Sequence, residues 1–149
     1  MRERSSSTLI ARIFLIACVC LISQATNAQA RSCSAAEADA ADAAVADIDS
    51  WPAVAFVAKK YRHCDDGSIA EGSSEAVARL LVDHWDQLSV LNKLSQRDPE
   101  LRRFVLRHVD STLDTDDLQK LHALVTRKCP KGVAGLCRDL GAQVKTALE

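Results

Sequence analysis

Apolar residues recur every three or four positions along most of the chain after residue 33, which is the spacing of one face of a helix. The clearest example is the segment 74–88, whose polar residues fall on the opposite face. Its apolar face carries Val77, Leu80, Leu81, His84, Trp85 and Leu88. No stretch shows the sustained alternation with a period of two that marks a half-buried strand. The pattern predicts an all-α protein, in which Ser73 or Ser74 caps this most apolar helix.

Capping signals divide the chain into further helices. Ser34 and Glu37 have the spacing of a capping box, in which each side chain accepts a hydrogen bond from the other residue's backbone amide. Asp98 precedes Pro99, and proline suits the first helical position because its missing N–H would have no partner there. The predicted helices cover about 34–48, 50–62, 74–88 with a continuation to 94, 98–109, 115–128 and 133–144. We therefore expect one compact bundle of five or six short helices, packed as antiparallel neighbours.

The first thirty residues have the organisation of a secretory signal peptide. Its positive leader carries Arg2, Arg4 and Arg12, and Ala28-Gln29-Ala30 is a small-x-small cleavage site. The apolar run 13–22 is too short to cross the roughly 30 Å core of a bilayer as a helix. We expect residues 1–30 to be removed, and residues 31–149 to form a single helical domain without a transmembrane segment. This domain would be periplasmic or secreted.

A second interpretation of the leader attaches the chain to a membrane. Leu15-Ile16-Ala17-Cys18 resembles a lipobox, which would make Cys18 a lipidated first residue. That interpretation leaves only residues 13–17 as the apolar segment, which is shorter than the roughly 7 to 15 residues usual for a signal peptide. Soluble export is therefore the favoured prediction, and lipid anchoring through Cys18 is the alternative.

The charge balance argues against nucleic-acid binding. The whole chain has 19 basic and 20 acidic residues, of which the leader holds three basic and one acidic. The remaining 119 residues carry 16 basic and 19 acidic side chains, a net charge of −3 with neutral histidine. A nucleic-acid-binding protein requires a clustered basic footprint. We expect a protein partner and no nucleic acid.

Four of the six cysteines remain after removal of the leader, which contains Cys18 and Cys20. An even number of cysteines in an oxidising compartment indicates disulfides, and four cysteines allow three pairings. We favour Cys33–Cys64 and Cys129–Cys137, because each bridge would close a helix pair or a short turn.

An acidic, glycine-rich stretch over residues 65–74 is the first candidate site. We expect a loop that presents Asp65, Asp66 and Glu71 to a basic groove of a partner protein. Two other interpretations are a solvated turn, since Asp and Gly favour turns, and a site for a hard cation, since calcium takes oxygen ligands. Trp51, at the start of a predicted helix, is the aromatic residue that we expect to be partly exposed at the interface.

The segment 110–117 is a second acidic loop. It is open to the same three interpretations. Helix capping carries more weight here, because Asp114 and Thr115 stand where a helix is expected to begin.

Three histidines fall on the apolar stripes of successive predicted helices, namely His84, His108 and His122. Three inward-facing histidines are the ligands of a catalytic or transport zinc site, so a metal-binding protein is an alternative function. The other interpretation is that each is a buried neutral histidine bonded to a neighbour. No HExxH motif or close Cys/His spacing supports a metal, and we expect no bound cofactor.

The sequence contains no recognisable catalytic constellation. The cysteines are expected to be oxidised, so no free thiolate is available, and Ser73 and Ser74 lack the GxSxG elbow of the hydrolases. Glu71 and Asp65 would form a carboxylate pair, but a helical domain of this size offers little cleft for a sugar chain. We therefore expect that the protein is not an enzyme.

The run Cys64–Gly72, followed by Val77-Ala78-Arg79-Leu80-Leu81 and Trp85, resembles a pattern in small exported bacterial helical proteins of unassigned activity. The general plan of leader, small helical domain and disulfides is similar to that of periplasmic immunity proteins that block cell-wall amidases delivered by rival bacteria. This likeness lies in the architecture, so no inhibitory residue carries over. It implies an inhibitor or immunity protein that acts by protein–protein contact. A structural envelope component without a ligand is a further alternative.

Overall fold

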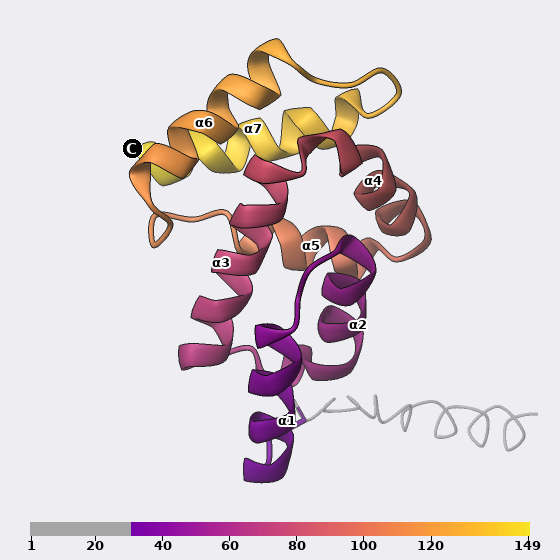
Figure 1. The fold of residues 1–149 in the computed structure, drawn as a ribbon, viewed down its shortest axis with the longest axis vertical. Coiled ribbons are helices and arrows are strands. Elements are labelled where there is room, and N and C mark those ends of the chain that lie inside the picture. Colours follow the sequence, from indigo (N-terminus) through magenta and orange to yellow (C-terminus); the bar gives the residue numbers. More distant parts are fainter. Residues whose placement is uncertain (1–30) are drawn as a thin grey trace, which may run out of the picture.

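The computed structural model describes residues 31–149, so the predicted signal peptide (1–30) and the alternative anchor Cys18 lie outside the described residues. Residues 31–149 fold into seven α-helices and no β-strand, which confirms the all-α prediction. The α-helices are α1 (Ala35–Ala46), α2 (Trp51–Tyr61), α3 (Gly67–Asp83), α4 (Leu88–Arg97), α5 (Pro99–Arg107), α6 (Thr115–Arg127) and α7 (Ala134–Leu148) (Figure 1). Among these residues no helix is both long enough and apolar enough to cross a membrane.

The helices pack as a bundle that narrows towards α1 (Figure 1). Helices α6 and α7 lie antiparallel across the upper end, and α3 extends from its contact with α1 up to α6. Helix α2 lies beside α1 and packs on α5. A single apolar core extends through all these contacts, from Ala41 in α1 to Val144 in α7.

The capping signals in the sequence are confirmed at three helix starts. Ser34 Oγ accepts a hydrogen bond from the Glu37 amide at 3.3 Å, and Glu37 Oε2 accepts one from the Ser34 amide at 3.1 Å. Asp98 caps α5, where its side chain accepts from the amide of Glu100 at 3.0 Å. Asp114 caps α6 in the same way. These bonds satisfy amides that the first turn of a helix leaves without an internal partner.

The predicted start of the third helix is wrong. Helix α3 begins at Gly67 instead of Ser74, and Asp66 is its N-cap, since Asp66 Oδ1 accepts a hydrogen bond from the Gly67 amide at 2.8 Å. Gly67 has a φ of +52°, a backbone conformation that glycine adopts without strain. The expected loop therefore shrinks to a turn at Asp65 and Asp66, because a capping aspartate and a glycine at the turn look the same in sequence as the residues of a longer loop.

The predicted helix over 74–88 also ends early. Helix α3 stops at Asp83, and a short 3-10 helix (Trp85–Gln87) leads into α4 as a separate element. The Trp85 indole N–H donates to the Lys128 carbonyl at 2.8 Å, which ties this break to the end of α6. The break gives seven helices, one more than the largest number that we expected.

Trp51 is fully buried, with 0% of its surface exposed, so the expected partial exposure of this residue is wrong. It belongs to the same stripe of α2 as Val54 and Tyr61, which faces the core. Trp51 is buried although it lies in the first turn of α2, because the exposed residue of that turn is the neighbouring Pro52.

The two predicted disulfides are confirmed. Cys33–Cys64 joins the start of α1 to the short 3-10 helix Arg62–Cys64 after α2, and Cys129–Cys137 joins the α6–α7 connection to the first turn of α7.

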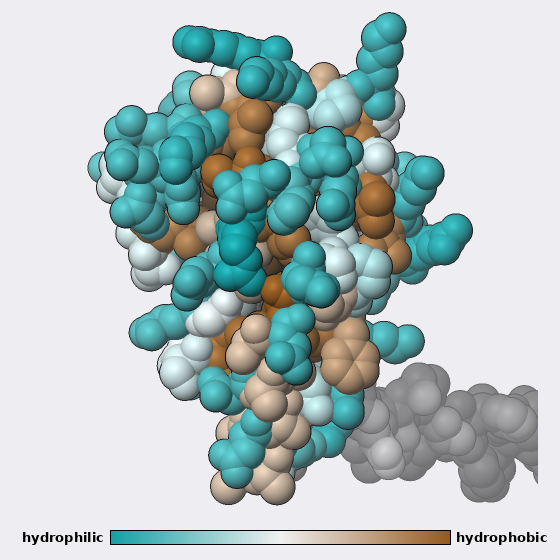
Figure 2. Space-filling model, in the orientation of Figure 1, coloured by the Kyte–Doolittle hydropathy of each residue, from teal (hydrophilic) through white to brown (hydrophobic). Residues whose placement is uncertain are grey.

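Helix α1 itself buries only Ala41 and Val45. Its outer surface is seen as the pale brown lower projection in Figure 2, where charged and polar side chains cover most of the rest of the view.

Candidate functional site

A groove of about 610 Å³ runs between α3 and the segment that leads into α6. Five carboxylates line it, and we call it the acidic groove. They belong to Glu71, Glu75, Asp83, Asp114 and Asp117. The only cationic side chain in its lining is Arg79.

The register of α3 builds one wall of this groove. Residues four apart lie one above the other on the same side of a helix. One such row carries Glu71, Glu75, Arg79 and Asp83. The neighbouring row, Ser74, Ala78 and Val82, forms the floor, so the rim of the groove is charged and the floor has small and apolar side chains. Leu113 adds a further apolar contact from the opposite wall.

The negative charge of the groove is largely uncompensated. Arg79 Nη2 donates to the carbonyl of Ile48 at 2.8 Å, which holds the guanidinium towards the α1–α2 connection. Asp117 pairs with Lys120 at 2.9 Å. Within residues 31–149, Glu71, Glu75 and Asp83 form no ion pair.

A buried polar network lies beneath the floor of the groove. Ser74 Oγ is 2.9 Å from His108 Nδ1, and His108 Nε2 is 3.2 Å from Asp65 Oδ2. Arg107 pairs with the same oxygen of Asp65 from the surface. The side chains of Asp65 and His108 are each only 4% exposed. The network joins α3, the end of α5 and the turn after Cys64.

Asp65 is held ionised in this network. Its burial acts to raise the pKa, but the contact with His108 and the ion pair with Arg107 outweigh that effect and hold the pKa of Asp65 below its ordinary value. The two ring nitrogens of His108 thus face different partners, Nε2 the carboxylate of Asp65 and Nδ1 the hydroxyl of Ser74.

The order serine, histidine, aspartate invites comparison with a hydrolase triad, but the surroundings favour a structural role. Ser74 lies inside α3, where the backbone amides are engaged in the helix and are not free to bind an oxyanion. Glu71 and Glu75 flank it on the groove side, and their charge opposes the negative charge that develops in acyl transfer. The network instead fixes the position of α3 against α5.

The four predicted partner-binding residues do not share one surface. Asp65 is buried in the polar network and Trp51 is in the core, so the expectation that they are exposed for a partner is wrong. Asp66 is exposed but serves as the N-cap of α3. Glu71 lines the acidic groove, although it lies in a helix and not in the expected loop.

The three predicted histidines are not brought together. His84 is exposed at the end of α3, and His122 is exposed on α6, so the prediction that they face inward is wrong. Each stands at the edge of its apolar stripe, where the sequence pattern does not separate a buried position from an exposed one. Only His108 is buried. The described residues contain no cluster of three or more His, Cys, Asp or Glu side chains arranged to hold a metal ion.

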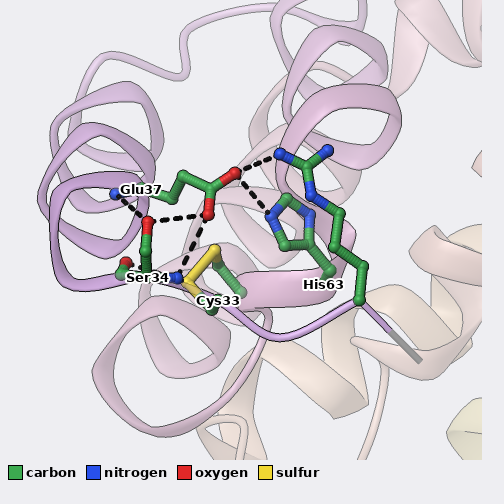
Figure 3. Close-up of a disulfide and its surroundings, with 6 residues drawn as sticks. Cys33, Ser34, Glu37 and His63 are labelled. Carbon is green, nitrogen blue, oxygen red and sulfur yellow. Dashed lines mark hydrogen bonds and ion pairs between the residues drawn. A yellow bond between two sulfur atoms is a disulfide. The ribbon is translucent and has the colours of Figure 1, made fainter. Parts of the chain in front are cut away.

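A second polar cluster lies beside the Cys33–Cys64 disulfide (Figure 3). Glu37 accepts hydrogen bonds from the Ser34 hydroxyl at 2.7 Å and the Ser34 amide, lies 3.3 Å from His63 Nε2 and pairs with Arg31. The bonds from Ser34, with smaller contributions from His63 and Arg31, lower the pKa of Glu37 to about 2. The cluster links the cap of α1 to the residue before Cys64.

Two of the groove residues, Glu75 and Asp83, had no place in the sites predicted from the sequence, whereas Asp114 and Asp117 belong to the second acidic loop, for which helix capping was favoured. The spacing of Glu71, Glu75 and Asp83 on one row of α3 would have indicated an acidic face, had the helix been extended back to Gly67. The opposite wall comes from the second acidic loop, which no local pattern places beside α3. The chain was compared with family models, with characterised proteins and with solved structures, and none of them matches it.

Proposed function

We propose that this protein is an exported, non-enzymatic module that acts by protein–protein contact, and that its acidic groove receives a basic segment of the partner. An inhibitor or immunity protein is the form of activity that this proposal favours. The two disulfides and the absence of a membrane-spanning helix in the described part of the chain are consistent with a location in the periplasm or outside the cell.

One observation carries the proposal: a concave surface whose rim has five carboxylates and whose lining has one cation. Like charges held close together repel one another, so a ligand that brings positive charge relieves a cost already present in the free protein. Exposed charges of this kind contribute chiefly to the rate of encounter and to partner choice.

The apolar floor of the groove indicates which kind of partner segment would fit it. Ala78, Val82 and Leu113 provide apolar contacts between the charged walls. An amphipathic helix fits such a surface by laying its apolar stripe on the floor and its lysine or arginine residues along the rims. We therefore propose a basic amphipathic helix of the partner as the bound segment.

A peptide titration tests this proposal. The probe is a synthetic amphipathic helix with lysine on its polar face, and its binding to the purified disulfide-bonded protein is measured by fluorescence anisotropy at low and at physiological salt. We expect the Glu71→Lys/Glu75→Lys variant to weaken binding by about tenfold or more, because two attractive rim contacts become repulsive.

The matched control is Asp39→Lys/Asp42→Lys, which makes the same change of charge on exposed positions of α1. This control should bind the peptide like the parent protein. An equal loss of peptide binding in both variants would contradict the proposal, because it would show that only the net charge matters. Equally tight binding of a control peptide that carries glutamate in place of lysine would contradict it as well.

A further inference from the structure

A second charged surface lies at the end of α2 and along α5. Arg62, which follows the last turn of α2, lies with its Nη1 atom 3.6 Å from Glu100 Oε2, and Arg103 pairs with the same carboxylate. Lys59 and Lys60 stand in that last turn of α2. We call the surface made by Lys59, Lys60, Arg62, Arg103 and Arg107 the basic face. Four of these cations belong to α2 and α5, which pack directly on each other, and Arg62 begins the 3-10 helix that follows α2.

The basic face has a large excess of positive charge. Glu100 is the one exposed carboxylate that the cations share, and its pKa is lowered by Arg103 first and then by Arg62 and Arg107. The carboxylate paired with Arg107 is Asp65, whose side chain is buried beneath the surface. Lys59 and Lys60 have no carboxylate partner among the described residues.

An exposed aromatic ring adjoins these charges. Phe56 is 52% exposed, the highest value of any large apolar side chain in the described chain. Lys60 Nζ lies 5.2 Å from the centre of the Phe56 ring and 4.9 Å from that of Tyr61. A phenyl ring that projects beside lysines and arginines is the arrangement of peripheral proteins, in which the ring enters the headgroup region and the cations contact lipid phosphates.

We propose that the basic face, with Phe56, docks on an anionic phospholipid surface. The disulfides favour a compartment outside the cytosol, in which lipid headgroups are the abundant polyanions. Docking of this kind requires no membrane-spanning helix.

The orientation that follows leaves the acidic groove accessible. In Figure 1, α2 and the loop that precedes α6 lie on opposite sides of α3. A domain seated on lipid through α2 therefore turns its acidic groove away from the negatively charged surface. This proposal does not depend on what the groove binds.

Vesicle co-sedimentation tests the proposal. The purified disulfide-bonded protein is mixed with vesicles of phosphatidylcholine alone, or with added phosphatidylglycerol, at low and physiological salt. We expect binding only to the anionic vesicles and a decrease with salt. The Lys59→Gln/Lys60→Gln variant should weaken binding by about 25-fold, at roughly fivefold for each lysine removed from the surface. Phe56→Ala should weaken it as well.

The matched control is Lys93→Gln/Lys131→Gln, which removes two exposed positive charges from other elements. It should bind like the parent, and circular dichroism should show that each variant melts as a folded protein. Failure to bind anionic vesicles, equal binding to neutral vesicles or an equal loss in the control would each overturn the proposal. Sedimentation equilibrium measures whether the protein forms a dimer. If it does, and Lys59→Gln/Lys60→Gln abolishes the dimer, the basic face binds a second copy of the chain and the lipid proposal is overturned.

Discussion

The two ends of the molecule are held together by different means. The α6–α7 hairpin buries large apolar side chains along both helices. They include Leu118, Leu121, Val125, Leu136, Leu140 and Val144. Helix α1 buries only Ala41 and Val45, yet it packs along α3. Burial of so little apolar surface stabilises α1 weakly. Helix α1 therefore depends on other links to the rest of the domain, whereas the α6–α7 hairpin is held by its apolar contacts.

Those other links are present at the α1 end. The Cys33–Cys64 bridge, the contact between Glu37 and His63 Nε2 and the bond from Arg79 to the Ile48 carbonyl all fasten α1 or its exit to the rest of the domain. The corresponding bridge at the α6–α7 end, Cys129–Cys137, closes a segment that is already local in sequence. Covalent and polar links are therefore concentrated where the core contributes least.

The largest expected effect comes from removing the disulfides one at a time. The bridges have sequence separations of 31 and 8 residues. Chain entropy then predicts a loss of about 3.7 kcal/mol for Cys33→Ser/Cys64→Ser and about 2.5 kcal/mol for Cys129→Ser/Cys137→Ser. Urea unfolding of both variants measures the difference. A larger loss of stability on removal of Cys129–Cys137 would contradict the view that the α1 end depends more strongly on its disulfide than the α6–α7 end does.

A smaller effect on stability is expected from replacing one glycine by alanine in each of two helix pairs, α1–α3 and α6–α7. A Cβ atom at Gly72 would lie 2.8 Å from Val45 Cγ1, and the β-branched valine is buried and stiff. Gly72→Ala should therefore cost about 1–3 kcal/mol of overpacking, less up to about 1 kcal/mol regained as helix propensity.

The matched variant is Gly141→Ala in α7, whose new Cβ would lie 3.5 Å from Val125 Cγ2, an ordinary contact. It should leave stability unchanged or raise it by up to about 1 kcal/mol. Thermal melts of the two variants compare the helix pairs directly. Equal shifts would mean that α1 and α3 do not approach as closely as the structure shows.

The smallest expected effect is the pH dependence that Asp65 adds to the stability of the protein. The folded protein holds the pKa of Asp65 below its ordinary value of 3.8, so ionised Asp65 contributes stability above that pH. The contribution is lost as the pH falls below about 4 and the carboxylate takes up a proton. Urea midpoints at pH 7 and pH 3 should differ more for the parent than for Asp65→Asn. Parallel midpoints would show that the network adds no acid sensitivity.

Local signals in the sequence predicted the helices and both bridges. The capping box at Ser34 and the Asp98-Pro99 start are properties of neighbouring residues, and neighbouring residues determine how a helix begins. The two disulfides close units that are recognisable from helix boundaries alone. The start of α3 was missed because Asp66 and Gly67 are as typical of a loop as of a helix start.

The candidate site was less predictable, because its parts are far apart in the sequence. The contact between Ser74 and His108 joins residues 34 positions apart, and Asp65 meets the same histidine from the turn before α3. The acidic groove combines one row of α3 with the segment before α6. Periodicity indicates which side of a helix is polar, but tertiary packing decides which polar sides meet.

The close approach of Gly72 to Val45 has a consequence for any related sequence. With the two backbones this near, the space between α1 and α3 holds one branched side chain and no more. A homologue with alanine or serine at position 72 should compensate with a smaller residue at position 45, and one that keeps valine at 45 should keep glycine at 72. The sizes of these two residues should therefore vary inversely across an alignment of relatives.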